Sequence, residues 1–258
     1  MSDVLYTTKE HIGLITINKA DKCNAFDTSL LKALQKLLEQ AIHDPQIRVL
    51  VLKANGAHFS AGADIQWMKS MASYNQEENI NDALILGRLM YSIYQCPKPV
   101  IAMIQGSAFG GGAGLAAACH IAIASDCARF CFSEVKLGLI PAVISPYVID
   151  AIGARSAQAL FVSGEIFDAQ KALALKLIHH CIPKESLSDF TLHYAQQISQ
   201  NAPQAVQQSL QLARDVKNKK IDESLLHYTA TLIAQKRVSP EGQAGLSAFL
   251  AKQKPNWN

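Results

Sequence analysis

A glycine cluster and one acidic residue are the features of this sequence best suited to chemistry. Residues 106–141 begin with a glycine-rich segment that leads into an apolar, alanine-rich stretch. Glu134 follows in a largely uncharged run. Backbone amides at a helix start can hold an oxyanion. A carboxylate in apolar surroundings can act as a general acid or base. The combination predicts acyl chemistry at a carbonyl or thioester.

A weak internal similarity between two segments, one of which contains the glycine cluster, strengthens this prediction. VLVLKANGAHFSAGADI (residues 49–65) and VIAMIQGSAFGGGAGLA (residues 100–116) each run from a strand through small residues and a Phe to a helix start. If the two strands are neighbours, both helix starts direct free N–H groups into one space. That is the geometry of an oxyanion hole.

Each of these features also has a plain structural interpretation. The glycines are compatible with close helix–strand packing alone. Glu134 could be a surface acid paired with Lys136, and Asp64 could simply cap a short helix. His120 fits a helix-end residue better than a base. The sequence leaves these alternatives open.

Other chemistries lack the residues that they need. The sequence has no P-loop, nucleophile elbow or HExxH motif, and Leu115 stands where a dinucleotide-binding GxGxxG needs its third glycine. The six cysteines form no CxxC pair and match no zinc spacing, so we expect no metal site and reduced thiols in the cytoplasm. They are Cys23, Cys96, Cys119, Cys127, Cys131 and Cys181.

Composition bounds the class of protein. With 258 residues, 49% hydrophobic and 17% charged, the chain fits one large globular domain or a domain with an appendage. A net charge of +3 is too balanced to imply nucleic acid or an anionic membrane. The first residues lack the pattern of a secretory signal. Residues 99–125 carry no charge, but their glycines disfavour a membrane helix and indicate buried strand, loop and helix.

Hydrophobic periodicity predicts an α/β core followed by helices. We expect strands at 4–8, 12–18, 49–53, 100–104, 121–124 and 129–131. We expect helices at 28–43, from about 63, and at 77–95, 111–119, 146–152, 156–163, 169–175, 184–200, 203–217, 222–237 and 240–252. A mobile loop is expected at 71–76. The predicted division is a core of residues 1–200 and a helical C-terminal region of residues 201–258.

Several segments together resemble the enoyl-CoA hydratase/isomerase family, or crotonase superfamily. They are NKADKCNAF (18–26), HFSAGADI (58–65), GSAFGGGAGLA (106–116), SEVKLGLIP (133–141) and the C-terminal EGQAGLSAFLAKQKPNW (241–257). The resemblance covers essentially the whole chain. It implies a spiral of β-β-α units with a C-terminal helical region for oligomerisation and closure of the CoA site. It also implies a homotrimer or a dimer of trimers.

The resemblance also implies roles for individual residues. The amides of Ala63 and Gly111 would form the oxyanion hole for the thioester oxygen. Backbone around Ala61, Asp64 and Ile65 would hold the adenine, and Lys22 would lie near the CoA phosphates. Phe249 and Lys252, at the C-terminal helix, would contribute to the CoA site, either of their own chain or of a neighbouring subunit. CoA would enter as part of the substrate, with no separate cofactor.

One position departs from the family pattern. Typical hydratases carry two glutamates, of which the second matches Glu134 and the first falls on Gly114. Ser145 and Tyr147 are candidates for the lost polar contacts. The leading prediction is an enoyl-CoA hydratase, because residues 130–153 resemble bacterial 3-methylglutaconyl-CoA hydratases of leucine breakdown. A Δ3,Δ2-enoyl-CoA isomerase using Glu134 alone and a non-catalytic acyl-CoA-binding protein are the alternatives.

Overall fold

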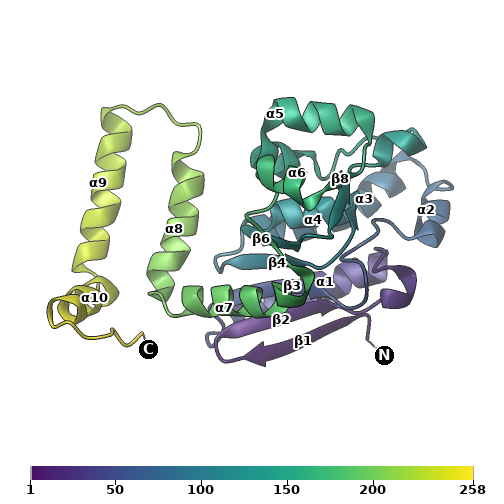
Figure 1. Cartoon of the computed structure of the whole chain (residues 1–258). Helices are drawn as coiled ribbons and strands as arrows, with labels where there is room; N and C mark the ends of the chain where they lie inside the picture. Colours follow the sequence, from purple (N-terminus) through teal and green to yellow (C-terminus); the bar gives the residue numbers. More distant parts are fainter. Residues whose placement is uncertain (1, 258) are drawn as a thin grey trace.

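The computed structural model describes residues 2–257, and its main element is a six-stranded sheet of order β1-β2-β3-β4-β6-β9 (Figure 1). β1 and β2 are antiparallel, and every later neighbouring pair is parallel. A small second sheet has the order β5-β7-β8. The strands are β1 (Val4–Lys9), β2 (Ile12–Ile17), β3 (Val49–Ala54), β4 (Val100–Ile104), β5 (Ala108–Phe109), β6 (Ile121–Ser125), β7 (Arg129–Cys131), β8 (Phe167–Asp168) and β9 (His180–Ile182).

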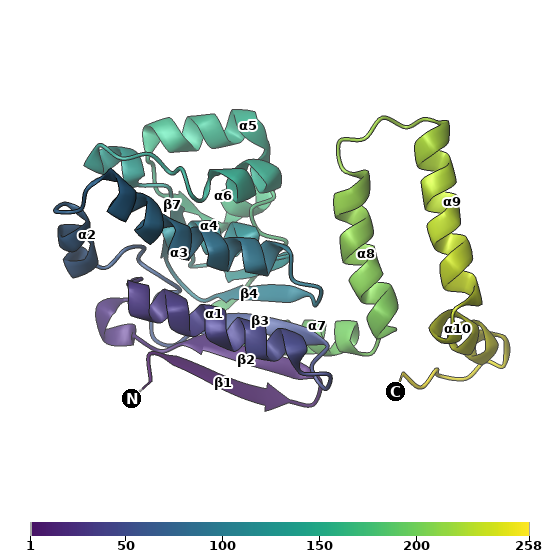
Figure 2. The ribbon, with the colours of Figure 1, turned by 180° about the vertical axis from the view of Figure 1, so that it is seen from behind.

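Helices cover both faces of the main sheet. Seen from behind, α1 and α3 cross one face with α4 beside them (Figure 2), and α7 packs on the other face against β2, β3, β4 and β6. The helices are α1 (Thr28–His43), α2 (Ile65–Met71), α3 (Gln76–Tyr94), α4 (Gly111–Ala118), α5 (Ser145–Ser163), α6 (Ala169–Ala174), α7 (Leu187–Ser199), α8 (Pro203–Val216), α9 (Glu223–Val238) and α10 (Pro240–Leu250). Single 3-10 turns lie at Ala20–Lys22, Glu134–Leu137 and Lys184–Ser186.

The strand β3 shows why its sequence is apolar throughout. Leu50 and Leu52 belong to the core cluster under α1 and α3, while Val49 and Val51 belong to the cluster under α7. Successive side chains of a strand point to opposite faces, so a strand covered on both faces needs an uninterrupted apolar run. The predicted α/β class is therefore confirmed.

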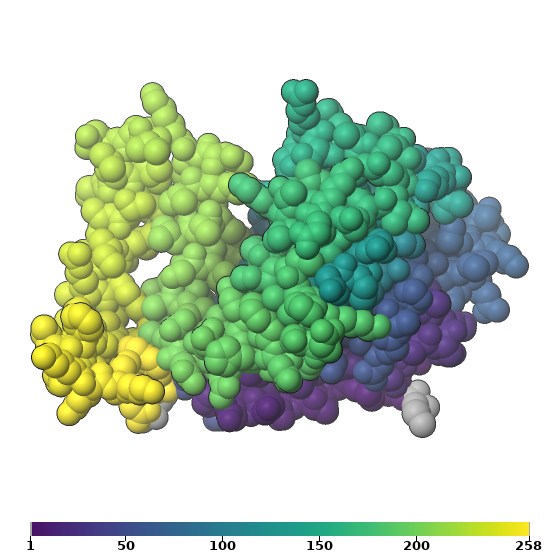
Figure 3. Space-filling view, in the orientation of Figure 1, coloured from purple at the N-terminus to yellow at the C-terminus, as the bar shows by residue number. Residues whose placement is uncertain are grey.

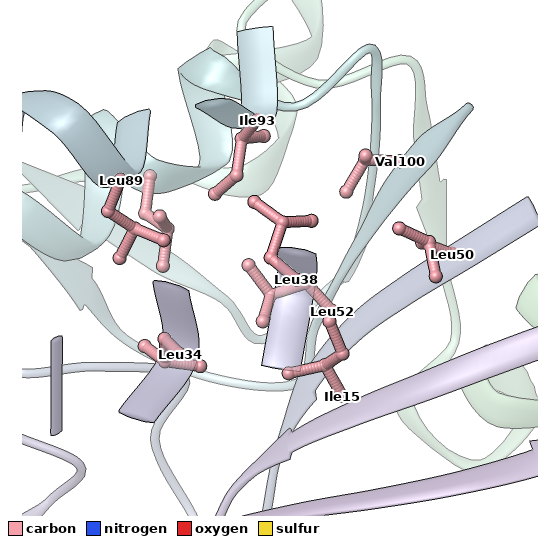
Figure 4. Close-up of a pocket in the computed structure, with 9 residues that line it drawn as sticks. Ile15, Leu34, Leu38, Leu50, Leu52, Leu89, Ile93 and Val100 are labelled. Carbon is pink, nitrogen blue, oxygen red and sulfur yellow. The ribbon is translucent and has the colours of Figure 1, made fainter. Parts of the chain in front are cut away.

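A small cavity remains in the larger core cluster (Figure 4). Its lining is hydrocarbon only and consists of Ile15, Leu34, Leu38, Leu50, Leu52, Leu89, Ile93, Val100 and Leu115. A thioester needs hydrogen-bond donors, which none of these side chains offers. The cavity is therefore a packing gap in the core and is not the candidate site.

The last three helices form an arm that stands apart from the rest of the chain (Figures 1 and 3). None of α8, α9 and α10 contains a buried residue. A groove between α8 and α9 is lined partly by Leu212 and Ile233. The Arg214 guanidinium ties α8 to the core by donating to the Tyr94 carbonyl at 3.0 Å. The first helix of the arm, α8, begins at Pro203.

Most element positions agree with the sequence prediction, and the differences have local causes. The break expected between residues 152 and 156 is Gly153, whose φ of 75° interrupts α5. After residue 145 the predicted elements were all helices, and the prediction missed the two short strands β8 and β9. The segment at 71–76 is short, since α2 reaches Met71 and α3 already begins at Gln76.

Candidate active site

Two loop–helix junctions lie side by side at the carboxyl ends of β3 and β4. We call residues 59–65 the first junction and residues 107–112 the second junction. The Ser60 amide donates to the Ser107 carbonyl at 3.1 Å, and the Phe109 amide donates to the Ser60 carbonyl at 3.0 Å. β3 and β4 are parallel neighbours, which is the condition that the internal similarity required. Both helix starts therefore emerge at one edge of the sheet.

The first junction leaves the Ala63 amide free. A bridge to Phe26 is formed by the residues on either side: the Phe26 amide donates to the Gly62 carbonyl at 2.7 Å, and the Asp64 amide donates to the Phe26 carbonyl at 2.8 Å. In such a parallel bridge, the N–H of the middle residue points away from the partner strand. No residue between 2 and 257 accepts a hydrogen bond from Ala63 N–H.

The second junction leaves the Gly111 amide free. Gly111 is the first residue of α4, where an N–H has no intrahelical acceptor, and no acceptor for it lies in the described part of the chain. Gly110 has φ 49° and ψ −119°, a conformation that a side chain would strain. The ring of Phe26 lies 3.3 Å from where a Cβ of Gly111 would stand. An apolar group thus covers the amide from one side.

Glu134 comes to the second junction from the next strand pair. β5 and β7 are parallel, and the Gly110 amide donates to the Cys131 carbonyl at 2.8 Å. The chain leaving β7 then brings Glu134 over Gly110: a Cβ on Gly110 would lie 3.3 Å from Glu134 Oε1. Glu134 thus lies against the second junction, and no ion pair with Lys136 is formed among the described residues.

The carboxyl group of Glu134 is poised to take up a proton. Its Oε2 is buried and receives no hydrogen bond from any residue that the structure describes. Burial raises the pKa of Glu134, and a hydrogen bond from its own backbone amide only partly opposes this shift. A raised pKa lets a carboxyl group keep its proton to a higher pH, which suits proton exchange with a bound molecule.

Asp64 caps α2, as its alternative interpretation predicted. Its carboxylate accepts from the amides of Gln66 at 2.8 Å and Trp67 at 3.3 Å, and Lys22 Nζ lies 3.4 Å from its Oδ2. Burial raises the pKa of Asp64, but these amides and the Lys22 ammonium lower it below its usual value. Ala61 joins the same corner, because its amide donates to the Cys23 carbonyl at 3.0 Å.

A buried aspartate on α3 was not predicted from the sequence. Asp82 Oδ1 accepts from Trp67 Nε1 at 3.0 Å and from the Thr28 hydroxyl at 3.4 Å. The contact ties α2, and with it the first junction, to α1 and α3. An acid directly before the apolar residues 83–86 is the signal that could have found it, since a buried Asp needs polar partners.

Some predicted site residues are not brought to the junctions. Phe249 is 79% exposed on α10, and Lys252 follows this helix. Both lie in the arm, far from α2 in the two views (Figures 1 and 2). Ile65 is also exposed, at 72%, but it lies at the first junction, where α2 starts. In this conformation, Phe249 and Lys252 do not reach the junctions of their own chain.

Three other candidates have structural tasks. The Ser145 hydroxyl donates to the Ala142 carbonyl at 2.8 Å, and Tyr147 packs edge-on against Tyr94. His120 Nδ1 accepts from the Val100 amide at 3.0 Å. Burial, with the nearby Arg214 charge, lowers the pKa of His120 to about 4, so it stays neutral as a helix-end residue.

Comparison with known proteins identifies the class that this fold and site define. The enoyl-CoA hydratase/isomerase family profile matches residues 7–258. The chain belongs to this family and is an enzyme of its hydratase, or hydro-lyase, type. No helix in the described range is both long and apolar enough to cross a bilayer.

Individual relatives agree over the full length. A solved structure from Legionella pneumophila, assigned to the enoyl-CoA hydratase/isomerase (crotonase) class, is 64% identical with a TM-score of 0.97, and 100% of each chain is covered. An enoyl-CoA hydratase from Shewanella pealeana is 42% identical with a TM-score of 0.95, covering 99% of this chain and 96% of the other. The 2,3-dehydroadipyl-CoA hydratase of Escherichia coli is 30% identical over 260 residues, with 100% and 99% covered. The expected crotonase-like fold is thus confirmed.

Proposed function

We propose that this enzyme adds water to an α,β-unsaturated acyl-CoA with Glu134 as its only acid–base group. The observation that supports the proposal is the meeting of two free amides, Ala63 and Gly111, beside a buried carboxyl group. In such a site the amides hold the thioester oxygen and stabilise the charge that develops on it.

A single carboxylate can balance the reaction. Glu134 takes a proton from water as the oxygen bonds to the β-carbon, and the electron pair of the double bond moves through the α-carbon onto the thioester oxygen. The enolate then collapses, and the α-carbon takes the proton from Glu134. The carboxylate is restored, and one water has been added. No separate cofactor takes part, because CoA belongs to the substrate.

For the substrate we propose a branched or carboxylated enoyl-CoA such as 3-methylglutaconyl-CoA. The sequence resemblance of residues 130–153 supports this choice. The name of the Escherichia coli relative, 2,3-dehydroadipyl-CoA hydratase, also denotes a carboxylated acyl group. For the CoA portion we propose Lys22, Ala61, Asp64 and Ile65 of one chain.

We further propose that Phe249 and Lys252 of a neighbouring copy complete the CoA site in a homotrimer or dimer of trimers. Support comes from the arm, whose helices bury no residue of their own and expose Phe249 and Leu250, each at 79%. An oligomer would cover this apolar surface. Light scattering after gel filtration measures the oligomeric state, and a monomer at working concentration would contradict the proposed oligomer.

A cytoplasmic location suits the six free cysteines.

The test follows loss of the conjugated enoyl-thioester absorbance with crotonyl-CoA, 3-methylglutaconyl-CoA and 2,3-dehydroadipyl-CoA. Glu134→Gln is the matched control, and we expect it to slow hydration by about 10²- to 10⁴-fold. The fastest ester identifies the acyl class. No loss with any of the three would contradict the proposal, and tight binding without turnover would point to an acyl-CoA-binding protein.

The pH dependence offers a second test. Glu134 must be ionised to accept a proton, and its pKa is raised by burial. Activity should therefore rise with pH through an acid limb that lies above the ordinary glutamate value of 4.5. An acid limb at or below that value in the pH profile of kcat/KM would count against Glu134 as the base.

An isomerase remains the second candidate, because Gly114 offers no second acid. One glutamate can move a proton between two carbons without adding water. Incubation of a 3-enoyl-CoA in D₂O, followed by mass spectrometry, distinguishes the reactions. A 2-enoyl product without a hydroxyl group would favour the isomerase, whereas a 3-hydroxy product from a 2-enoyl ester favours the hydratase.

A further inference from the structure

The side chain of Ile144, the residue just before α5, packs against Gly114 in α4. A Cβ placed on Gly114 would lie 2.3 Å from Ile144 Cγ2, 2.6 Å from Ile144 Cβ and 3.0 Å from Met90 Cε. Ile144 is 2% exposed and Met90 is 0% exposed. In this packing, position 114 accepts only a hydrogen atom.

Gly114 lies about one helical turn beyond Gly110, the residue before α4 that Glu134 covers. The Gly114 amide donates to the Gly110 carbonyl at 3.0 Å, so the two glycines are one helical turn apart. Glu134 Oε1 lies over Gly110, and Ile144 lies over Gly114. A side chain at position 114 would therefore enter the space that Ile144 occupies, about one helical turn from the glycine that Glu134 covers.

We propose that Ile144 is a specificity-determining residue that restricts this site to a single carboxylate. The inference rests on the proposed function, since it concerns the same acid–base step. Gly114 and Ile144 form a matched pair, in which the bulk of one requires the absence of a side chain on the other. The absence of a carboxyl group at position 114 therefore depends on two residues, Gly114 in α4 and Ile144 just before α5.

Ile144 cannot withdraw easily, which makes it the deciding member of the group. It is the N-cap of α5, and its carbonyl accepts a hydrogen bond from the Val148 amide at 3.1 Å. The turn before it is closed by the Ser145 amide and hydroxyl, both donating to the Ala142 carbonyl. Its β-branched side chain has few rotamers, whereas the unbranched Met90 can adapt.

The chemical consequence is an apolar α4 wall beside one proton carrier. The proton that leaves water must return to the α-carbon through Glu134, since no second carboxyl group fits there. A second carboxyl group close to Glu134 would also raise the pKa of the pair. Ile144 removes that coupling, so a single carboxyl titration should govern the acid limb.

A stability cycle tests the packing. Gly114→Ala adds only a Cβ, and we expect it to lower the Tm of the wild type by on the order of 5 °C. Added to Ile144→Gly, the same change should cost far less, because both clashing carbons are gone. Ile144→Ala is the matched control: it keeps the Cβ that lies 2.6 Å away, so Gly114→Ala should remain costly there.

A second pair of variants tests the chemistry. Gly114→Glu with Ile144→Gly should show a second titrating carboxyl group in the pH profile of crotonyl-CoA hydration. Gly114→Gln with Ile144→Gly has the same shape without the acid and should not. If the wild type hydrates nothing but the Glu variant does, the role of Ile144 is supported and only the hydratase proposal fails.

Three outcomes would overturn the inference. The first is a Tm for Gly114→Ala equal to that of the wild type. The second is relief by Ile144→Ala as large as relief by Ile144→Gly. The third is superimposable pH profiles for the Glu and Gln double variants. The Ala cycle gives a result even where the Glu variant fails to fold.

Discussion

The two junctions each present one free amide, but they hold it by different means. At the first junction, polar side chains hold the backbone in place: Asp64 caps α2, Lys22 pairs with Asp64, and Trp67 donates to Asp82. α2 itself contains no buried residue. At the second junction, packing does the work. A Cβ on Gly112 would lie 2.8 Å from both the side chain and the carbonyl of Ser60, and most of α4 is buried.

This difference separates a rigid half of the site from an adjustable half. Local opening is easiest where few apolar contacts would be lost. The second junction would have to break core packing to move, whereas the first would break only a few polar contacts. We therefore expect changes at the second junction to abolish function and changes at the first to tune it.

Gly111→Pro should have the largest effect. Proline removes the N–H but suits the first position of a helix, so α4 should still form. Loss of one oxyanion donor costs about 10²- to 10³-fold in kcat. Gly111→Ala keeps the N–H and measures the cost of the added Cβ near Phe26. A folded Gly111→Pro enzyme with wild-type kcat on its best ester would contradict the expectation that changes at the second junction abolish function.

Trp67→Phe should have an intermediate effect at the first junction. It removes the donor to Asp82, leaving this buried acid with only the Thr28 hydroxyl, at a cost of about 1–3 kcal/mol in the free energy of unfolding. The Ala63 amide should shift, lowering kcat by about tenfold. Denaturant unfolding and steady-state kinetics measure both. Asp82→Asn retains an acceptor oxygen and should be milder, and the opposite order would refute this role.

Asp64→Ala should destabilise α2 by about 0.5–2 kcal/mol through loss of its cap. Asp64→Asn keeps a capping oxygen and loses only the charge. The pKa of Asp64 in the folded protein lies below its usual value of 3.8, so its charge stabilises the protein above that pH. This contribution is lost as pH falls through the lowered pKa. The Tm gap between wild type and Asp64→Asn should close in acid, and a gap that widens there would be inconsistent.

Lys22→Ala should have the smallest effect on stability. The lysine side chain is 43% exposed, so its pair with Asp64 is worth less than about 1 kcal/mol. KM for the CoA ester should rise, because the CoA phosphates lose a positive charge, while kcat stays the same. Lys22→Arg is the matched control. An unchanged KM in Lys22→Ala would remove this residue from the CoA site.

The sequence predicted those parts of the fold that local signals define. The bounds of α1 follow from the Asp27 cap and the helix-ending Pro45, and the helix runs from Thr28 to His43. The three-residue β9 carries no such signal. It is a strand only because β6 offers it an edge to pair with. Pairing between distant segments is decided by the whole fold and cannot be read from a short window.

The same limit applies to the site. The same local pattern occurs twice in the sequence, and it implied an oxyanion hole on the condition that β3 and β4 are neighbours, which the sheet order meets. The contact between Ile144 and Gly114 joins α5 to α4, and neither residue alone indicates it. Likewise, Asp82 acquires its partners only when α2 and α3 pack together. Side chains that act through another element are the part that sequence reasoning missed.

The strand order of the main sheet bears on how the chain is made. From β1 to β9, each strand pairs with the strand of that sheet that came just before it in the chain. A growing chain leaving the ribosome can therefore add each strand to an edge that is already present. The junctions after β3 and β4 can meet before Glu134 is placed. On this order of synthesis, the two junctions with their free amides are formed first, and Glu134, the proposed acid–base group, joins them later.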